Sequence, residues 1–452
     1  MRRFAFGIGK HNFGVSAYSC MPRVNAWRPL RVRRRGFRSA PAGYIPKRIG
    51  VRRDTLSFMP QQYPPLQAPK RLLFGPGPSL VAPRIYQAMT QSVVGHLDPF
   101  FFEVAGEIRS LLGYAYSTEN QFNLAISGTG SSGMEAAVAN FTEPGARFAL
   151  LTNGFFGDRI GEMAKRQGGE VVRLAKAWGE PFDPSEAREF ILKQRPRVVA
   201  AVQAETSTGM YNQLKPICEA AHEVDAVVIA DCVTSLGGMP VLVDENGIDI
   251  AYSCTQKGLG CPPGLSPMTV SPRALERLKS RATPVQSWYL DLQLLDTYYT
   301  GHKYHHTASA TMFYALREGL AMVAEEGREN RWERHRRNHL AFVAGIEAMG
   351  LSMHVPEGHR LWTLNTPRLP QGVDDAKLRQ YLLTERGIEV AGGFGPLAGQ
   401  VLRVGLMGYG STADNVFLVL EALEDALRQQ GYAPAGNVRK AAEDVLAAAA
   451  RA

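Results

Sequence analysis

Short apolar runs alternate with amphipathic helical segments over the middle of this chain. Six runs read as buried strands, at residues 122–126, 148–152, 198–202, 227–230, 248–251 and 268–270. The segments between them carry apolar residues at helical spacing, as in Met134, Ala137, Val138 and Phe141. Strands that alternate with helices are typical of a mostly parallel sheet covered on both faces. The pattern therefore predicts an α/β fold.

A second, smaller α/β unit is expected towards the C-terminus. Charged helical sequence covers residues 324–339, and strand candidates follow at residues 361–365 and 401–404. The Pro- and Gln-rich stretch before residue 75 reads instead as an extended arm. We therefore expect five parts: a basic leader (1–53), an N-terminal arm (54–75), a large domain (76–330), a small domain (331–435) and a peripheral C-terminal helix (436–452).

The positive charge of the chain is concentrated in its leader. Residues 1–53 contain 14 Lys and Arg and no Asp or Glu, whereas the other 399 residues contain 37 basic and 42 acidic side chains. A nucleic-acid surface would make the folded body basic, so no nucleic-acid partner is expected. An Arg-rich, acid-free leader resembles a mitochondrial transit peptide. A disordered basic tail and a true start at Met21 or Met59 are the alternatives.

The expected location in the cell depends on that leader. A cleaved transit peptide would place the protein in the mitochondrial matrix, and otherwise a cytoplasmic location is expected. The final Ala450-Arg451-Ala452 lacks the leucine that ends a peroxisomal address. No apolar stretch approaches the length that spans a bilayer, so no membrane partner is expected. The five cysteines show no paired or metal-type spacing, which favours buried free thiols and no metal site.

Lys257 is the first candidate for chemistry. It follows an apolar run and precedes Gly258-Leu-Gly-Cys-Pro-Pro-Gly264, which cannot continue a helix or a central strand. A lysine at such a strand end can be turned inward and lose part of its hydration, which lowers its pKa and makes the amine nucleophilic. An exposed lysine on a surface loop is the alternative reading of this residue taken alone.

A glycine-rich turn at residues 127–133 is the second candidate. It joins the run 122–126 to a helix, so free backbone N–H groups and hydroxyls at the helix start face a common point. Thr129, Gly130 and Ser131 could hold a phosphate there, although the spacing is not that of a P-loop. An ordinary strand-to-helix turn with a capping serine would show the same pattern.

Polar residues also end two other predicted strands. Asp231 follows the run 227–230, and Glu205-Thr-Ser-Thr-Gly209 follows the run 198–202. A carboxylate at the end of a buried strand needs a cationic partner, and no neighbouring cluster completes a metal site. Strand ends on one edge of an open α/β sheet converge. A phosphate cradle, a buried aspartate and a lysine amine are the three groups that pyridoxal 5'-phosphate requires.

From Leu72 to about Gln430 the chain resembles the class V aminotransferases of fold type I, in particular alanine–glyoxylate and serine–pyruvate aminotransferases. The resemblance rests on segments in matching order, which include Gly75-Pro-Gly-Pro-Ser79, Ser127-Gly-Thr-Gly130, Asn153-Gly154, Glu205-Thr-Ser-Thr-Gly209, Asp231-Cys-Val-Thr-Ser-Leu-Gly-Gly238, Pro262-Pro-Gly264, Tyr304-His-His-Thr307 and Val401-Leu-Arg-Val-Gly-Leu-Met-Gly408. It implies a large domain with a mostly parallel seven-stranded sheet and a smaller C-terminal α/β domain. It also implies pyridoxal 5'-phosphate as the cofactor and a homodimer with shared active sites.

The resemblance assigns roles residue by residue. Lys257 matches the lysine that bonds to the cofactor, and Asp231 matches the partner of the pyridine nitrogen. Arg403 matches the arginine that grips the substrate carboxylate, and an intramolecular ion pair is the other reading of Arg403. Further positions match cofactor contacts (Thr129, Gly130, Ser131, Phe156, Ser207, Val233, Gln256), a substrate contact (Gly75) and contacts made across the dimer (Tyr304, Thr307).

Two of these positions depart from the family pattern. Phe156 stands where tryptophan is common, and it can stack on a ring but lacks the indole N–H donor. Ser131 stands where histidine is common. Both substitutions bear on which substrate is used. His305 and His306 have no carboxylate near them in the sequence, which favours structural roles over metal binding or base catalysis.

The resemblance implies transamination between a small amino donor, alanine or serine, and a small 2-oxo acid, with glyoxylate expected as the acceptor. No second arginine matches a family position for a distal carboxylate, so aspartate and glutamate are expected to be poor donors. A 3-hydroxykynurenine transaminase, a lyase such as a cysteine desulfurase and a non-catalytic relative are the alternatives. A desulfurase needs a reactive cysteine in the small domain, and no cysteine follows Cys261.

Overall fold

The computed structural model describes residues 63–449. The expected leader (1–53) and residues 54–62 of the expected arm lie outside the described residues. The chain divides into a unit of residues 1–67 and a unit of residues 68–452, and the fold below is that of the second unit. Within residues 63–449, no helix is both long and apolar enough to cross a membrane.

Seven strands form the main sheet, in the order β2-β10-β9-β8-β5-β3-β4. β10 is antiparallel to both of its neighbours, and the other strands all run in one direction. The predicted α/β fold with a mostly parallel seven-stranded sheet is therefore confirmed. The strands are β2 (Phe122–Ser127), β3 (Arg147–Thr152), β4 (Glu170–Ala175), β5 (Val198–Val202), β8 (Val227–Asp231), β9 (Ile250–Tyr252) and β10 (Leu265–Val270).

Within the main sheet, β4 is the strand that the hydrophobic pattern did not reveal. It lies at the edge of the sheet beside β3 and is only partly buried. Because every side chain of β4 is at least partly exposed, the strand can include Glu170 and Arg173, and it shows no continuous apolar run. The interior strands β5 and β8 are buried along their whole length, which explains why they are apolar up to Asp231.

Helices pack around this sheet and share one hydrophobic core with it, which extends from Ala82 to Val323. Helices α3 and α4 pack together, as do α5 and α6. The helices of this part are α1 (Pro83–Met89), α2 (Pro99–Tyr116), α3 (Gly130–Phe141), α4 (Phe155–Arg166), α5 (Pro184–Gln194), α6 (Lys215–Glu223), α7 (Val243–Asn246), α8 (Pro272–Lys279), α9 (Leu292–Gly301) and α10 (Ala310–Glu326). A short hairpin of β6 (Ala204–Glu205) and β7 (Met210–Tyr211) follows β5.

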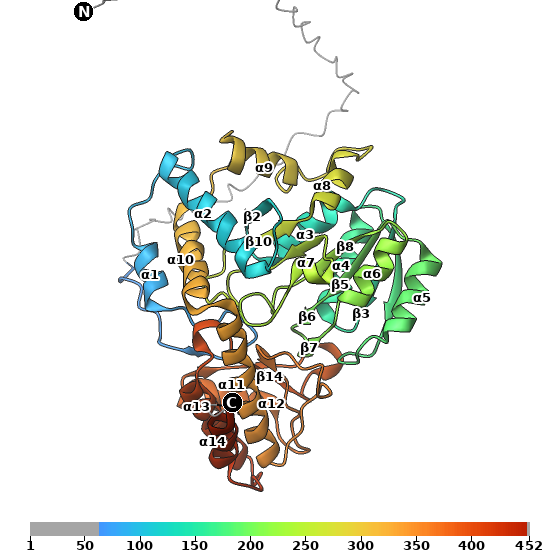
Figure 1. The fold of residues 1–452 in the computed structure, drawn as a ribbon. Helices are drawn as coiled ribbons and strands as arrows, with labels where there is room; N and C mark the ends of the chain where they lie inside the picture. The colour runs from blue at the N-terminus through green and yellow to red at the C-terminus, as the bar shows by residue number, and fades with distance from the viewer. Residues whose placement is uncertain (1–62, 450–452) are drawn as a thin grey trace, which may run out of the picture. The chain divides into compact units, whose positions relative to one another are not determined.

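A second hydrophobic core lies in the C-terminal part of the chain, drawn in orange and red in Figure 1. Phe74 and the terminal-helix residues Val438 and Ala442 are buried in it. Its helices are α11 (Arg328–Ala348), α12 (Asp375–Glu385), α13 (Ala413–Arg428) and α14 (Val438–Ala449), with short 3-10 turns at Gly395–Leu397 and Gly408–Gly410. Its strands are β11 (Leu364–Asn365), β13 (Ala391–Gly392) and β14 (Leu402–Gly405), and β1 (Leu72–Leu73) pairs with β12 (Ile388–Glu389).

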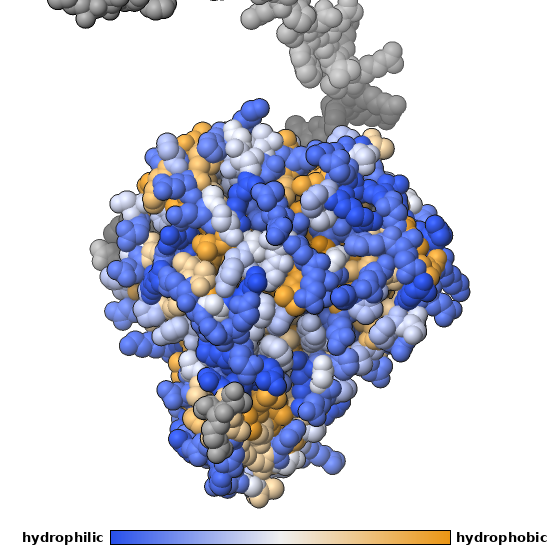
Figure 2. Space-filling model, in the orientation of Figure 1, coloured by the Kyte–Doolittle hydropathy of each residue, from blue (hydrophilic) through white to orange (hydrophobic). Residues whose placement is uncertain are grey.

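The charged segment 324–339 spans the end of one helix and the start of another. α10 ends at Glu326 and α11 begins at Arg328, with Gly327 between them at a φ of 81°. That left-handed backbone is readily adopted only by glycine, so the chain can turn from the first core to the second at this residue. The expected domain limits stay a prediction. Figure 2 shows a largely hydrophilic surface on the face in view, with hydrophobic residues in separate patches.

Candidate active site

Lys257 lies in a loop whose backbone is held by two hydrogen bonds from Ser79. Ser79 donates hydrogen bonds from its Oγ to the Lys257 carbonyl oxygen at 2.8 Å and from its N–H to the Gln256 carbonyl oxygen at 3.0 Å. Gly77 packs against the lysine side chain, and a Cβ there would lie 2.6 Å from Lys257 Cε. The side chain is 7% exposed, and this burial lowers the pKa of Lys257. The lysine is therefore turned inward, as a reactive amine requires.

Asp231 is the last residue of β8 and is paired in register with Tyr252 at the end of β9, five residues before Lys257. Its carboxylate accepts hydrogen bonds from the Val233 N–H at 2.9 Å and from the Tyr252 hydroxyl at 2.8 Å. Burial raises the pKa of Asp231 to about 7, whereas the nearby charge of Lys257 lowers it. No ion pair of Asp231 occurs within the described chain, so this carboxylate is suited to a cationic ligand.

The turn after β2 leaves donors free at the start of α3. Thr129 is the N-cap residue of α3, yet its side chain makes no capping hydrogen bond. The first N–H groups of a helix have no acceptor within the helix. Thr129 and Ser131 are exposed, while Gly130 is buried, with Cys254 and Val233 so close that a Cβ would lie 3.0 Å from Cys254 Cβ. The predicted phosphate cradle is thus an uncapped helix start.

A buried carboxylate, Glu205, organises the start of α4. Its Oε2 accepts hydrogen bonds from the N–H groups of Phe156 and Gly157 at 3.1 and 3.2 Å. Its Oε1 accepts from the N–H and the hydroxyl of Ser207 at 3.0 and 2.6 Å. Burial raises the pKa of Glu205, and these four donors oppose that rise because they favour the charged form. Ser207 spends its only hydroxyl donor on Glu205, so a predicted cofactor contact is engaged within the protein.

Arg403 of β14 is buried, and its two terminal amino groups have no hydrogen-bond partner within residues 63–449. Its Nε donates to the Gly392 carbonyl oxygen at 2.8 Å, and its guanidinium carbon lies 3.8 Å from the centre of the Phe394 ring. Burial lowers the pKa of Arg403 to about 10. In residues 63–449 it forms no ion pair, so the intramolecular pair considered as an alternative is not found there. Gly75 borders the same strand, since the Gly405 N–H bonds to the carbonyl of Phe74.

The structure does not join Tyr304 and Thr307 to these groups within one chain. Tyr304 is 62% exposed and contacts the His96 ring, and Thr307 is also exposed. His305 and His306 are buried and share a hydrogen bond between their Nδ1 atoms at 2.9 Å. His306 Nε2 lies 2.7 Å from the Ser127 hydroxyl, and burial lowers the pKa of His306 to about 4. His306 therefore has a structural contact at the base of the phosphate turn, and His305 supports it.

Arg159 and Phe394 touch this site and were not singled out from the sequence, and the role of Glu205 was not predicted. Glu205 lies in the run 205–209, so its polar strand end was visible, but its hydrogen bonds to α4 were not. Arg159 and Phe394 gave no signal, because their contacts join segments far apart in the chain. The part of the chain that the structure describes contains no group of three or more His, Cys, Asp or Glu placed to bind a metal.

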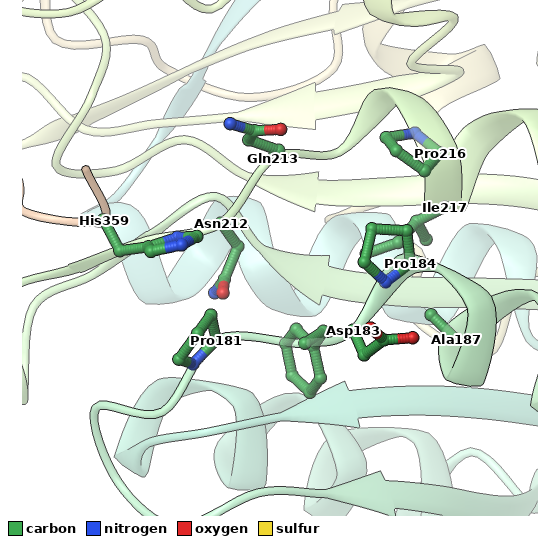
Figure 3. Close-up of a pocket in the computed structure, with 10 residues that line it drawn as sticks. Pro181, Asp183, Pro184, Ala187, Asn212, Gln213, Pro216, Ile217 and His359 are labelled. Atoms are coloured by element: carbon green, nitrogen blue, oxygen red, sulfur yellow. The ribbon is translucent and has the colours of Figure 1, made fainter. Parts of the chain in front are cut away.

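A cavity of about 300 Å³ opens elsewhere, between the N-terminal ends of α5 and α6 (Figure 3). Prolines, Phe182, Asn212 and His359 line it, and none of the predicted site residues does. Asn212 forms a reciprocal amide pair with Asn153, at 2.9 and 3.2 Å, just before the start of α4. Through Asn212, the cavity thus adjoins the segment that leads into α4.

Comparison with known proteins identifies close relatives. The family model described as aminotransferase class-V matches residues 84–416. The chain is 39% identical over 406 residues to (S)-ureidoglycine–glyoxylate transaminase of Bacillus subtilis, covering 85% of this chain and 98% of the relative. It is 38% identical over 369 residues to alanine–glyoxylate aminotransferase of Mus musculus, covering 80% and 89%. A crystal structure of alanine–glyoxylate aminotransferase from Nostoc sp. matches with a TM-score of 0.80 at 48% identity, covering 81% and 98%.

Proposed function

Because the chain belongs to the class V aminotransferases, a family that depends on pyridoxal 5'-phosphate, we propose that it uses this cofactor to move an amino group between small molecules. The proposed acceptor is glyoxylate, and the proposed donor is alanine or serine. The names of the three relatives described above support this acceptor, since each includes glyoxylate. They differ in the donor, which is therefore the part of the proposal most in need of a direct test.

Buried Lys257 and buried Asp231 at adjacent strand ends carry the proposal. The buried carboxylate of Asp231 has no cationic partner among the described residues. The protonated pyridine nitrogen of the cofactor would supply one. Gln256, a predicted cofactor contact, has a buried Oε1 with no hydrogen-bond partner in the described residues. The uncapped start of α3 offers N–H groups and hydroxyls to a phosphate. These residues fit the cofactor. Val233 packs against Gly130 of the cradle, and Arg159 connects Phe156 to Ser131.

When bound, pyridoxal 5'-phosphate supplies an aldehyde that bonds to amines and a ring that accepts the electrons released at the substrate α-carbon. Lys257 Nζ, whose pKa is lowered by burial, would accept the proton of that carbon. Asp231 would keep the ring nitrogen protonated, since a buried carboxylate stabilises an adjacent cation. The two unpaired amino groups of Arg403 would bind the substrate carboxylate in a fork.

The cysteines do not favour a desulfurase. Cys218, Cys232, Cys254 and Cys261 are all buried. Burial raises the pKa of Cys254 and Cys261 to about 12, so neither would be a thiolate at neutral pH. A reactive thiol is what a desulfurase needs, and residues 262–449 contain no cysteine.

The proposal includes a homodimer with shared active sites. Tyr304 and Thr307 are exposed in one chain, and the large side chain of Trp288, stacked on His305 at 4.3 Å, is 60% exposed beside them. An exposed aromatic cluster is typical of an interface. Refolded mixtures of the Lys257→Ala and Tyr304→Ala variants should therefore regain activity, because a hybrid dimer would contain one intact site. Two inactive variants that stay inactive in hybrid dimers would exclude sharing.

A donor–acceptor matrix on the purified enzyme tests the reaction itself. Alanine, serine, (S)-ureidoglycine and glutamate should be assayed with glyoxylate, pyruvate and 2-oxoglutarate. We expect alanine or serine with glyoxylate to give the highest kcat/KM. Glutamate with 2-oxoglutarate as the best pair would refute the small-substrate assignment, and (S)-ureidoglycine as the best donor would correct the donor alone. Protein that stays colourless after addition of pyridoxal 5'-phosphate, with no label at Lys257 after borohydride, would refute the cofactor.

A further inference from the structure

Arg159 lies between the start of α4 and the phosphate turn. Its guanidinium carbon is 5.0 Å from the ring centres of both Phe155 and Phe156. Its Nη1 donates a hydrogen bond to the Oγ of Ser131 at 3.2 Å. The two rings hold the guanidinium by cation–π contact, which limits the positions that the long side chain can take. Arg159 is therefore fixed beside the residue that ends the predicted phosphate cradle.

The charge of Arg159 is not balanced by a carboxylate. Its acidic neighbours on α4 are already paired, Asp158 with Arg173 at 2.9 Å and Glu162 with Arg166 at 2.9 Å. No ion pair of Arg159 itself occurs among the residues that the structure describes, and its polar contact is the neutral Ser131 hydroxyl. An arginine held in place with its charge unpaired is suited to an anion from outside the chain.

The cradle itself lacks any positive side chain. Thr129, Gly130 and Ser131 offer N–H groups and hydroxyls, whereas a phosphate ester carries a charge of about −1.5 to −2 at pH 7. The partial charge at a helix start is roughly half of one unit, so it balances only part of this charge. Arginine is well suited to phosphate because its planar fork can donate two parallel hydrogen bonds.

We propose that Arg159 is a further cofactor-binding residue, which supplies the positive charge opposite the cofactor phosphate at the Ser131 end of the cradle. This inference rests on the proposed use of pyridoxal 5'-phosphate. It gives the chain a means of selecting phosphorylated over unphosphorylated pyridoxal, because only the phosphorylated form presents an anion to Arg159. It also explains how a cradle with Ser131 in place of a histidine can hold a dianion.

The experiment compares two ligands on cofactor-free protein. Dissociation constants for pyridoxal 5'-phosphate and for pyridoxal are measured by absorbance titration on the wild type and on Arg159→Gln, Arg159→Lys and Arg166→Gln. Arg166 is the matched control, an exposed arginine of the same helix that is paired with Glu162. We expect Arg159→Gln to weaken binding of the phosphorylated ligand by about tenfold or more and to leave pyridoxal binding within about twofold. Arg159→Lys should be intermediate, and the control should match the wild type.

Equal weakening of both ligands would overturn the inference, since it would mean that Arg159 only braces Phe155 and Phe156. Unchanged affinities in both Arg159 variants would overturn it as well. If Arg159→Gln fails to fold, the Arg159→Lys variant and the competition of inorganic phosphate against the phosphorylated ligand still decide the question. Wild-type protein that binds neither ligand would instead refute the proposed function, so the two failures are distinguishable.

Discussion

Arg331 donates a hydrogen bond from its Nη2 to the carbonyl oxygen of Gly258, the residue after Lys257, at 2.9 Å. The same guanidinium donates from its Nε to the carbonyl of Gly237 at 2.7 Å, in the loop that follows Asp231. Arg331 belongs to α11, whose later residues lie in the second core. One buried side chain from the C-terminal part of the chain thus ties together the two loops that carry the candidate lysine and aspartate.

Arg331→Met is expected to destabilise the fold strongly. The change would leave two buried carbonyls without donors and remove one partner of Glu326, which keeps its pairing with Arg334. We expect the free energy of unfolding to fall by about 3 kcal/mol. Chemical denaturation measures it, with Arg336→Met as the control, since Arg336 is exposed and its ion pair within residues 63–449 is with Glu333. A loss equal to that of the control would show that Arg331 does not hold these loops.

Glu205→Gln is expected to disturb the start of α4. The carboxylate of Glu205 now accepts hydrogen bonds on both oxygens. The NH₂ group of a glutamine would instead place a donor against the N–H groups of Phe156 and Gly157, or against that of Ser207. We expect a loss of about 2–4 kcal/mol in the free energy of unfolding. Asp158→Asn is the control, because Asp158 lies in the same helix turn in an exposed ion pair worth at most about 1 kcal/mol. Similar losses in the two variants would contradict the capping role of Glu205.

Asp231 should make the stability of the cofactor-free protein fall as pH rises. The pKa of Asp231 rises from an ordinary 3.8 to about 7 in the folded chain, so the folded state binds a proton that the unfolded state has lost. The contribution of Asp231 to stability is therefore greatest at low pH and is lost as pH rises through 7, by on the order of 3 kcal/mol between pH 5 and pH 8. Denaturation of wild type and Asp231→Asn at both pH values isolates this contribution. A pH dependence that is the same in both proteins would count against the burial argument.

Arg403→Gln is expected to lower kcat/KM for every amino donor by about a hundredfold, because all donors share the carboxylate that Arg403 would bind. Steady-state kinetics with alanine and serine measures the loss, and the ratio between the two donors should not change. Arg386→Gln, which removes an exposed ion pair with Asp425, is the control and should match the wild type. A loss confined to one donor would mean that Arg403 reads the side chain of the substrate instead of its carboxylate.

Phe394→Leu tests the ring that covers Arg403. The ring lies 3.8 Å from the guanidinium carbon and 5.4 Å from Phe155, so it shields the arginine on one side. We expect KM for the donor to rise by about threefold to tenfold, as a lost cation–π contact implies, with kcat little changed. Leu418→Ala, at an exposed position of α13, serves as the control. A drop in kcat with KM unchanged would contradict a role in holding Arg403.

The buried strands and the polar residues that end them could be predicted from the sequence alone. β5 and β8 are covered on both faces, so only apolar residues fit there, and Glu205 and Asp231 stand out where those runs stop. Lys257 could also be identified from its neighbours, because the glycines and prolines that follow it prevent regular secondary structure. Burial and backbone freedom depend mainly on residues that are neighbours in the sequence, so both can be predicted from it.

Contacts between residues far apart in the chain could not be predicted and are known from the folded structure. Arg331 reaches Gly258 across 73 positions of sequence, and Glu205 bonds to Phe156 across 49. The edge strand β4 was missed because its half-exposed sequence shows no apolar run. The hydroxyl of Ser207 donates to Glu205, and the terminal amino groups of Arg403 have no partner within the described residues. Such contacts depend on how distant segments pack, and the type of a residue does not fix which partner it meets.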